Sequence, residues 1–129
     1  MQYMLLIYGD PAAAEQAGEP PASAFKDWPD SSRALADAGV LLAGEGLEAV
    51  SEATSVRNRE GDELVTDGPF AETKEVLLGY YLLDLPDRDT ALGWAARMPH
   101  VHWGTVEVRA IAESAGSASA FLGGATSAA

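Results

Sequence analysis

Two stretches of the chain are apolar on both of their alternate sets of side chains, and they constrain the fold more than any other feature. Residues 2–8 (Gln-Tyr-Met-Leu-Leu-Ile-Tyr) and residues 76–83 (Val-Leu-Leu-Gly-Tyr-Tyr-Leu-Leu) contain almost no polar side chain. Both are short for helices, and such runs are typical of strands that are buried on both faces. We therefore expect two strands, each buried on both faces.

The remaining segments predict two helices, two further strands and a hairpin. In chain order, we expect a helix over 29–38, a strand over 40–43, a hairpin from 53–59 and 63–66, a helix from 87 to about 98, and a strand over 105–111. This order matches a ferredoxin-like α+β sandwich of the dimeric α+β barrel type, a βαββαβ plan with an inserted β-hairpin. The aromatic side chains at helical spacing, Phe25, Trp28 and Trp94, are expected in its core.

The length of 129 residues allows one domain, since two independent cores are unfavourable at this size. We expect that domain over residues 1–111. Residues 112–129 are rich in Ser, Ala and Gly and are expected to form a mobile tail, with Phe121-Leu122 as its apolar anchor.

In this fold both helices cover the same face of the sheet, so strands that are apolar on both sides leave the other face exposed. A contiguous apolar patch of that kind usually marks an interface, and a homodimer is the simplest way to cover it. The expected interface carries Leu5, Ile7, Leu78 and Tyr80 or their alternates. The period alone does not decide between the two sets, because both are apolar.

Charge and composition exclude several classes of protein. Eight basic and 20 acidic side chains give a net charge of −12, which disfavours nucleic acid as a partner. The chain has no cysteine, which removes thiolate metal sites, disulfides and cysteine nucleophiles. No apolar run approaches the ~20 residues of a membrane span, and no basic residue precedes the opening apolar run as in a signal peptide. We therefore expect a cytoplasmic protein without a membrane contact.

Asp67 and the two histidines are the candidates for catalysis. Asp67-Gly68-Pro69-Phe70 is explained by turn chemistry, and it can also hold the Asp67 carboxylate at the rim of a cavity as a base. His100 and His102 lie between a proline and a strand, where an extended segment would point both rings the same way. His100 follows Pro99 directly and is interpreted as a solvated loop histidine, which leaves His102 as the better candidate. A metal site would need a further ligand that the sequence does not identify, so neither a metal nor a cofactor is expected.

Three further side chains are candidates for the edge of a substrate pocket. Glu45 lies between two glycines at a strand end, Arg57 lies on the hairpin, and Tyr81 lies on a central strand. Arg57 and Arg59 share one hairpin face, where they could hold an anion or simply protect an edge strand. If a pocket exists, we expect it where the Asp67 turn approaches the segment before the last strand, with an Asp67–His102 pair within one chain or across a dimer.

The central run of the chain resembles a known signature. Residues 65–75 (Val-Thr-Asp-Gly-Pro-Phe-Ala-Glu-Thr-Lys-Glu), followed by Gly79-Tyr80-Tyr81-Leu82-Leu83, resemble the DGPF-type branch of the YCII-related proteins, and residues 3–8, 53–57 and 104–109 are similar to the same family. The resemblance covers roughly residues 1–111. It implies a dimeric ferredoxin-like domain, and Asp67 matches the motif aspartate of a His–Asp dyad proposed for YCII-like members. His100 and His102 do not stand where the histidine of that dyad would fall.

Two functions of different classes follow from the resemblance. The first is a cofactor-free enzyme that performs acid–base chemistry on a small organic molecule with Asp67 and His102. The second is a non-catalytic ligand-binding or regulatory dimer, since DGPF-type proteins are often associated with extracytoplasmic-function sigma factors. The sequence names no substrate under either hypothesis.

Overall fold

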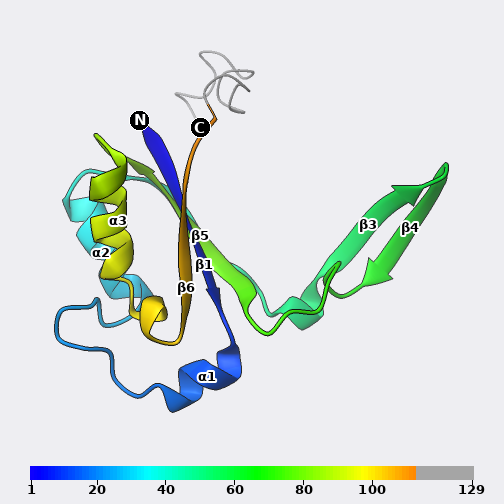
Figure 1. Ribbon diagram of the computed structural model, residues 1–129, viewed down its shortest axis with the longest axis horizontal. Helices are drawn as coiled ribbons and strands as arrows, with labels where there is room; N and C mark the ends of the chain where they lie inside the picture. Colours follow the sequence, from blue (N-terminus) through cyan, green and yellow to red (C-terminus); the bar gives the residue numbers. More distant parts are fainter. Residues whose placement is uncertain (113–129) are drawn as a thin grey trace.

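A four-stranded antiparallel sheet forms the centre of the protein in the computed structural model, which describes residues 1–112 (Figure 1). Its strands are β1 (Gln2–Gly9), β2 (Leu41–Gly46), β5 (Val76–Asp84) and β6 (Gly104–Ala110), in the order β2-β5-β1-β6. The two apolar runs, β1 and β5, are the central pair, with Leu5 opposite Tyr81. The mixed α+β architecture and the predicted order of its elements are confirmed, and they are consistent with a ferredoxin-like fold.

Two helices, α2 (Trp28–Asp37) and α3 (Arg88–Ala96), cover one face of this sheet (Figure 1). Asp27 and Asp87 cap them by accepting hydrogen bonds from the backbone N–H groups of Asp30 and Thr90. The Thr90 hydroxyl also donates to Asp87, and these two bonds lower the pKa of the Asp87 carboxyl. The helices therefore begin one residue from the expected positions 29 and 87.

Shorter elements connect the sheet and the helices. They are α1 (Pro11–Gln16), the 3₁₀ helix η1 (Val50–Glu52) and the 3₁₀ helix η2 (Pro99–His102). Strands β3 (Thr54–Arg59) and β4 (Asp62–Asp67) pair in a separate two-stranded sheet. This hairpin, residues 54–67, extends away from the four-stranded sheet on the side opposite the helices and is called the arm below (Figure 1).

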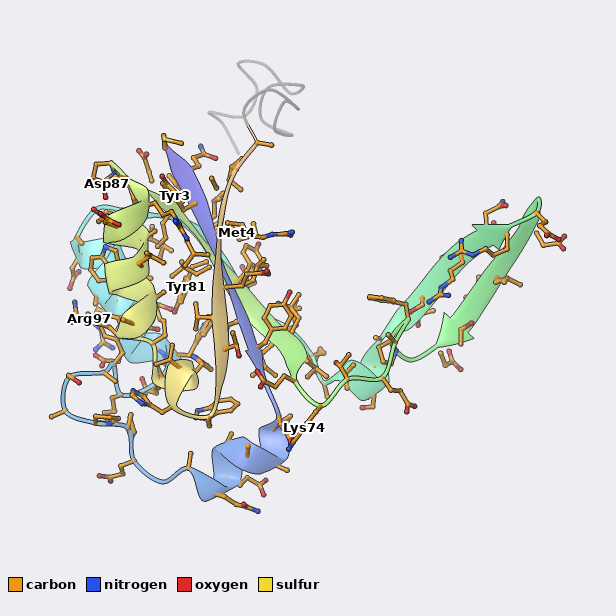
Figure 2. The ribbon with its side chains drawn as sticks, in the orientation of Figure 1. Tyr3, Met4, Lys74, Tyr81, Asp87 and Arg97 are labelled. Carbon is orange, nitrogen blue, oxygen red and sulfur yellow. The ribbon has the colours of Figure 1, made fainter. Side chains whose placement is uncertain are left out.

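The alternation of side chains along β1 and β5 decides which set enters the core. Tyr3, Leu5 and Ile7 of β1 are buried, and so are Tyr81 and Leu83 of β5. Tyr3 and Tyr81 lie on the side of the sheet that the helices cover (Figure 2). The helices and the loops around them contribute Phe25, Leu35, Leu85, Ala91, Ala95 and Met98, with Trp28 and Trp94 packed at the edge. The three aromatic side chains expected in the core are therefore found there or against it.

The opposite set of side chains forms an apolar surface that no element covers within residues 1–112. It consists of Met4, Leu6 and Tyr8 of β1 with Tyr80 and Leu82 of β5, and it is called the open face below. All five side chains are partly exposed. Leu5 and Tyr80 thus lie on opposite faces, and the set that contains Leu5 and Ile7 belongs to the core. The structure therefore decides which of the two alternate sets of side chains is buried, a choice that the sequence pattern does not make.

The expected tail lies outside the described residues from residue 113 onward. Among residues 1–112, no helix is long and apolar enough to cross a membrane.

Candidate functional site

A cavity of about 530 Å³ lies beside the Asp-Gly-Pro-Phe segment, between η1 and the ends of β1 and β5. Most of its lining is apolar, as is typical of sites for small organic molecules. The residues that line it are Tyr8, Leu47, Glu48, Ala49, Val50, Glu52, Ala53, Pro69, Phe70, Ala71, Thr73, Glu75, Val76 and Leu77.

The wall that Pro69 and Phe70 contribute is held against one face of the arm. Gly68 has a positive φ of 97°, and its backbone N–H donates to the Ala53 carbonyl at 2.6 Å. The Ser55 hydroxyl donates to the Gly68 carbonyl at 2.8 Å, and the Arg57 guanidinium donates to the Phe70 carbonyl at 2.7 Å. The glycine conformation and these three bonds fix the course of the segment. The positive φ of Gly68 agrees with the turn interpretation of the motif, but no hydrogen bond to the Asp67 carboxylate is present within residues 1–112.

Phe70 stands at the mouth of the cavity and is 77 % exposed. The Arg57 guanidinium carbon lies 5.9 Å from the centre of its ring, at the outer limit of a cation–π contact. Arg57 therefore positions Phe70 through both the backbone and the ring. Arg57 does not itself line the cavity, and its role in binding a substrate stays a prediction.

Three carboxylates line the cavity, and no lysine, arginine or histidine of residues 1–112 does so. Of these, Glu75 accepts a hydrogen bond from the Thr105 hydroxyl at 2.9 Å, which joins the cavity wall to β6. All three side chains, those of Glu48, Glu52 and Glu75, are exposed. The cavity is thus apolar with a negative rim, which disfavours anionic ligands.

Asp67 is the last residue of β4, opposite Thr54, and its side chain is exposed. It does not line the cavity, and its carboxylate makes no hydrogen bond or ion pair within residues 1–112. The alternation along β4 puts Asp67 on the arm face that carries Val65, and not on the face where Ser55 and Arg57 hold the Phe70 segment.

The two histidines line a second, smaller cavity of about 230 Å³, together with Lys26, Asp27, Trp28 and Trp103. They belong to the 3₁₀ helix η2, so the expectation of an extended segment is wrong, although both residues line the same cavity. The physical reason is Pro99, whose fixed φ starts the helical turn.

The imidazole of His100 lies in a partly buried, aromatic environment. Its Nδ1 atom is buried without a hydrogen-bond partner, and its ring lies against the rings of Trp28 and Trp103, at centroid distances of 6.2 and 5.3 Å. Burial lowers the pKa of this imidazole because it disfavours the charged form. The interpretation of His100 as a solvated loop residue is therefore wrong.

The remaining candidates do not gather at one place. Glu45 lies opposite Tyr80 in the sheet, at the border of the open face. Tyr81 is fully buried, and its hydroxyl bonds with the hydroxyls of Ser31 and Ser32 at 2.7 and 2.6 Å. No hydrogen bond or ion pair joins Asp67 to His102 within residues 1–112, and the two line no common cavity, so their pairing stays a prediction.

Two sets of residues at these sites were not predicted from the sequence. One is the apolar lining of the larger cavity, in particular Leu47, Val50 and Leu77. The other is the environment of His100. The apolar residues that follow Gly46 are a weak indication of a binding site in the sequence. The cavity itself forms only because residues 69–77 return alongside η1. No group of three or more potential metal ligands exists among residues 1–112.

Comparison with known proteins gives two results. Residues 1–115 match the YCII-related domain. The chain is also 35 % identical over 115 residues to an uncharacterised protein of Rhizobium meliloti strain 1021, an alignment that covers 87 % of this chain and 93 % of that protein.

Proposed function

The chain belongs to the YCII-related family, and from that premise we propose that it is a homodimer that binds a small, largely apolar organic molecule in the cavity beside Phe70. The volume and the lining of the cavity are the observations that support this proposal. Its volume of about 530 Å³ is within the range of small-molecule sites, and a few polar groups, among them Thr73 and Glu75, interrupt an apolar lining.

The three carboxylates that line the cavity restrict the charge that a ligand can carry. Glu48, Glu52 and Glu75 would repel a carboxylate or a phosphate, and no lining cation among the described residues offsets them. We therefore propose a neutral or cationic ligand. The anion considered for Arg57 and Arg59 would not bind in this cavity, because neither arginine lines it.

The homodimer is supported by the open face. Five apolar side chains on two adjacent strands have no cover within residues 1–112, and a second copy offers the same surface by symmetry. Tyr8 belongs both to the open face and to the cavity lining. A second copy on this face would therefore border the cavity.

A pair of probes with the same skeleton tests the site. N-phenyl-1-naphthylamine is neutral, and 1-anilinonaphthalene-8-sulfonate adds one negative charge to it. We expect the neutral probe to bind at least ~10-fold more tightly, because the three carboxylates that line the cavity repel the sulfonate. Fluorescence titration measures both dissociation constants.

A variant that fills the cavity locates the probe. Ala71→Trp should weaken binding of the neutral probe about 10-fold, whereas Leu92→Ala, on the exposed side of α3, should leave it unchanged. Equal binding by both variants would show that the probe sits elsewhere, and tighter binding of the sulfonate would overturn the charge assignment.

Acid–base catalysis at the second cavity is a further candidate function, and His100 is the observation that favours it. A histidine with a lowered pKa is neutral at neutral pH and can act as a base or nucleophile. Hydrolysis of p-nitrophenyl acetate, an activated ester, tests this. We expect the rate to fall on substituting His100→Gln and His102→Gln, whereas rates equal to wild type in both variants would remove the candidate.

A regulatory role read by a partner protein, such as an extracytoplasmic-function sigma factor, is compatible with the binding function and needs no catalytic group. It would require that probe binding at the cavity change the affinity for that partner.

A further inference from the structure

We propose that in the homodimer each arm packs against the second copy through the face that carries Val56 and Val65. This inference rests on the homodimer of the proposed function. It adds a second contact, called the clasp below, in which the arm of each copy packs against the other copy.

The two faces of the arm differ in what already covers them. Opposite residues share a face, so Val56 and Val65 lie together with Thr54 and Asp67, whereas Ser55 and Arg57 lie on the other face. That other face is occupied, because Ser55 and Arg57 hold the Gly68–Phe70 segment. Val56 and Val65 are 64 % and 60 % exposed and face nothing within residues 1–112.

An isolated two-stranded hairpin is marginally stable in water. Six residue pairs connect β3 and β4, and neither strand pairs with the four-stranded sheet. Every residue of β4 and all but Ser55 of β3 are exposed. The contacts at Gly68 and Phe70 anchor only the base of the arm, so its outer part lacks a partner.

The arm points to where a second copy would stand. The helices lie on one side of the sheet and the arm extends on the other, which is the side of the open face (Figure 1). A second copy docked on the open face therefore stands beside the arm. Two-fold symmetry puts the second arm beside the first copy, and one assembly then covers both unpartnered surfaces.

The area of the open face also points to a second contribution. Four strands at ~4.8 Å spacing, over about seven residues at ~3.3 Å each, span a footprint of roughly 440 Å². Stable complexes bury about 800 Å² on each partner. The arm, two strands wide and six residues long, adds roughly 200 Å² for each copy, and each copy both gives and receives an arm. With both arms counted, each copy approaches the area that a stable dimer needs.

Photo-crosslinking tests the proposal directly. The chain has no cysteine, so Val65→Cys creates a single attachment site for benzophenone maleimide. We mix the labelled chain with a ¹⁵N-labelled wild-type chain at a concentration where sedimentation shows a dimer. We expect crosslinks between chains of different mass from Val65→Cys. Leu64→Cys, which occupies the other face one residue away, is the matched control and should give at least five-fold fewer.

Lysine substitutions on the arm measure how much this contact contributes to the affinity of the dimer. Val56→Lys with Val65→Lys should raise the dimer dissociation constant at least ~10-fold, because two charges would be buried against the second copy. Leu64→Lys with Thr66→Lys, on the other face, should change it less than ~3-fold. Circular dichroism checks that all variants stay folded.

The outcomes separate the two proposals. A dimer without crosslinks between chains at Val65, or with equal effects of both lysine pairs, overturns the clasp and leaves the sheet-face dimer standing. A monomer at every concentration up to about 100 μM overturns the homodimer, and the clasp with it.

Discussion

The four-stranded sheet and the arm are built from the same kind of antiparallel pairing, yet they differ in what holds them. In the sheet, every second side chain of β1 is buried beneath two helices. In the arm, the same alternation leaves almost every side chain exposed on both faces. The two regions therefore differ in burial, and also in pairing, since β1 and β5 each pair with two strands whereas β3 and β4 pair only with each other.

This difference assigns separate tasks to the two regions. Burial of apolar area is the dominant favourable term in folding, so the sheet and its helices carry the stability of the single chain. The arm and the segment that follows it shape the cavity wall, and they carry the surfaces available to a second copy. Regions of low stability are commonly those used for binding.

The largest expected effect is the contrast between a core side chain and an arm side chain. Leu5→Ala should lower the free energy of unfolding by about 3 kcal/mol, because it leaves a cavity beneath the helices. Val56→Ala should cost less than ~0.5 kcal/mol in the monomer. Urea unfolding at nanomolar protein concentration measures both, and equal costs would show that the arm belongs to the same cooperative core.

Two paired glycines of the four-stranded sheet differ in the space available for a side chain. A Cβ on Gly79 would lie 2.7 Å from the Glu45 carbonyl oxygen and 3.1 Å from the Trp28 ring, so Gly79→Ala should destabilise the protein by about 2 kcal/mol. Gly46, its neighbour across the strands, has open space and is the matched control, expected within ~1 kcal/mol of wild type.

In the arm a glycine matters for a different reason. Gly61 has φ of 86° and nothing near its Cβ position, so only the backbone opposes a side chain. Gly61→Asn should therefore be tolerated better than Gly61→Val by about 1 kcal/mol, since Asn enters the left-handed region more readily. Thermal unfolding of the two variants measures the difference, and equal melting temperatures would contradict a backbone origin.

The hydroxyl of Tyr81 gives a smaller contrast across the two faces of β5. Tyr81→Phe should cost about 1–2 kcal/mol, because the buried hydroxyl bonds with both Ser31 and Ser32. Tyr80→Phe, on the open face, should change the monomer's stability by less than ~0.5 kcal/mol. A cost as large for Tyr80 would mean that the open face is covered within one chain.

The last effect depends on pH. Since burial lowers the pKa of His100, the unfolded chain takes up a proton near pH 6.5 while the folded chain does not. The free energy of unfolding should therefore fall as pH is lowered from about 7 through 6.5. Substituting His100→Gln should flatten this dependence, whereas His102→Gln should retain it. A wild-type slope in the His100→Gln variant would contradict the assignment.

The sequence by itself determined the order of the elements. That order depends on local patterns, such as the apolar runs at 2–8 and 76–83 and the cap at Asp87. Such patterns act within one or two turns of chain, so they can be identified without knowledge of distant contacts.

Only the tertiary structure decided which set of side chains faces the helices and where the functional groups gather. Leu5 and Leu6 are equally apolar, and their roles differ because α2 and α3 both cross one face. His100 reads as a loop histidine in sequence, and it is perturbed because Trp28, 72 positions earlier, packs beside it. The cavity likewise forms where β1, η1 and residues 69–77 meet, and burial of this kind depends on residues far apart in the chain.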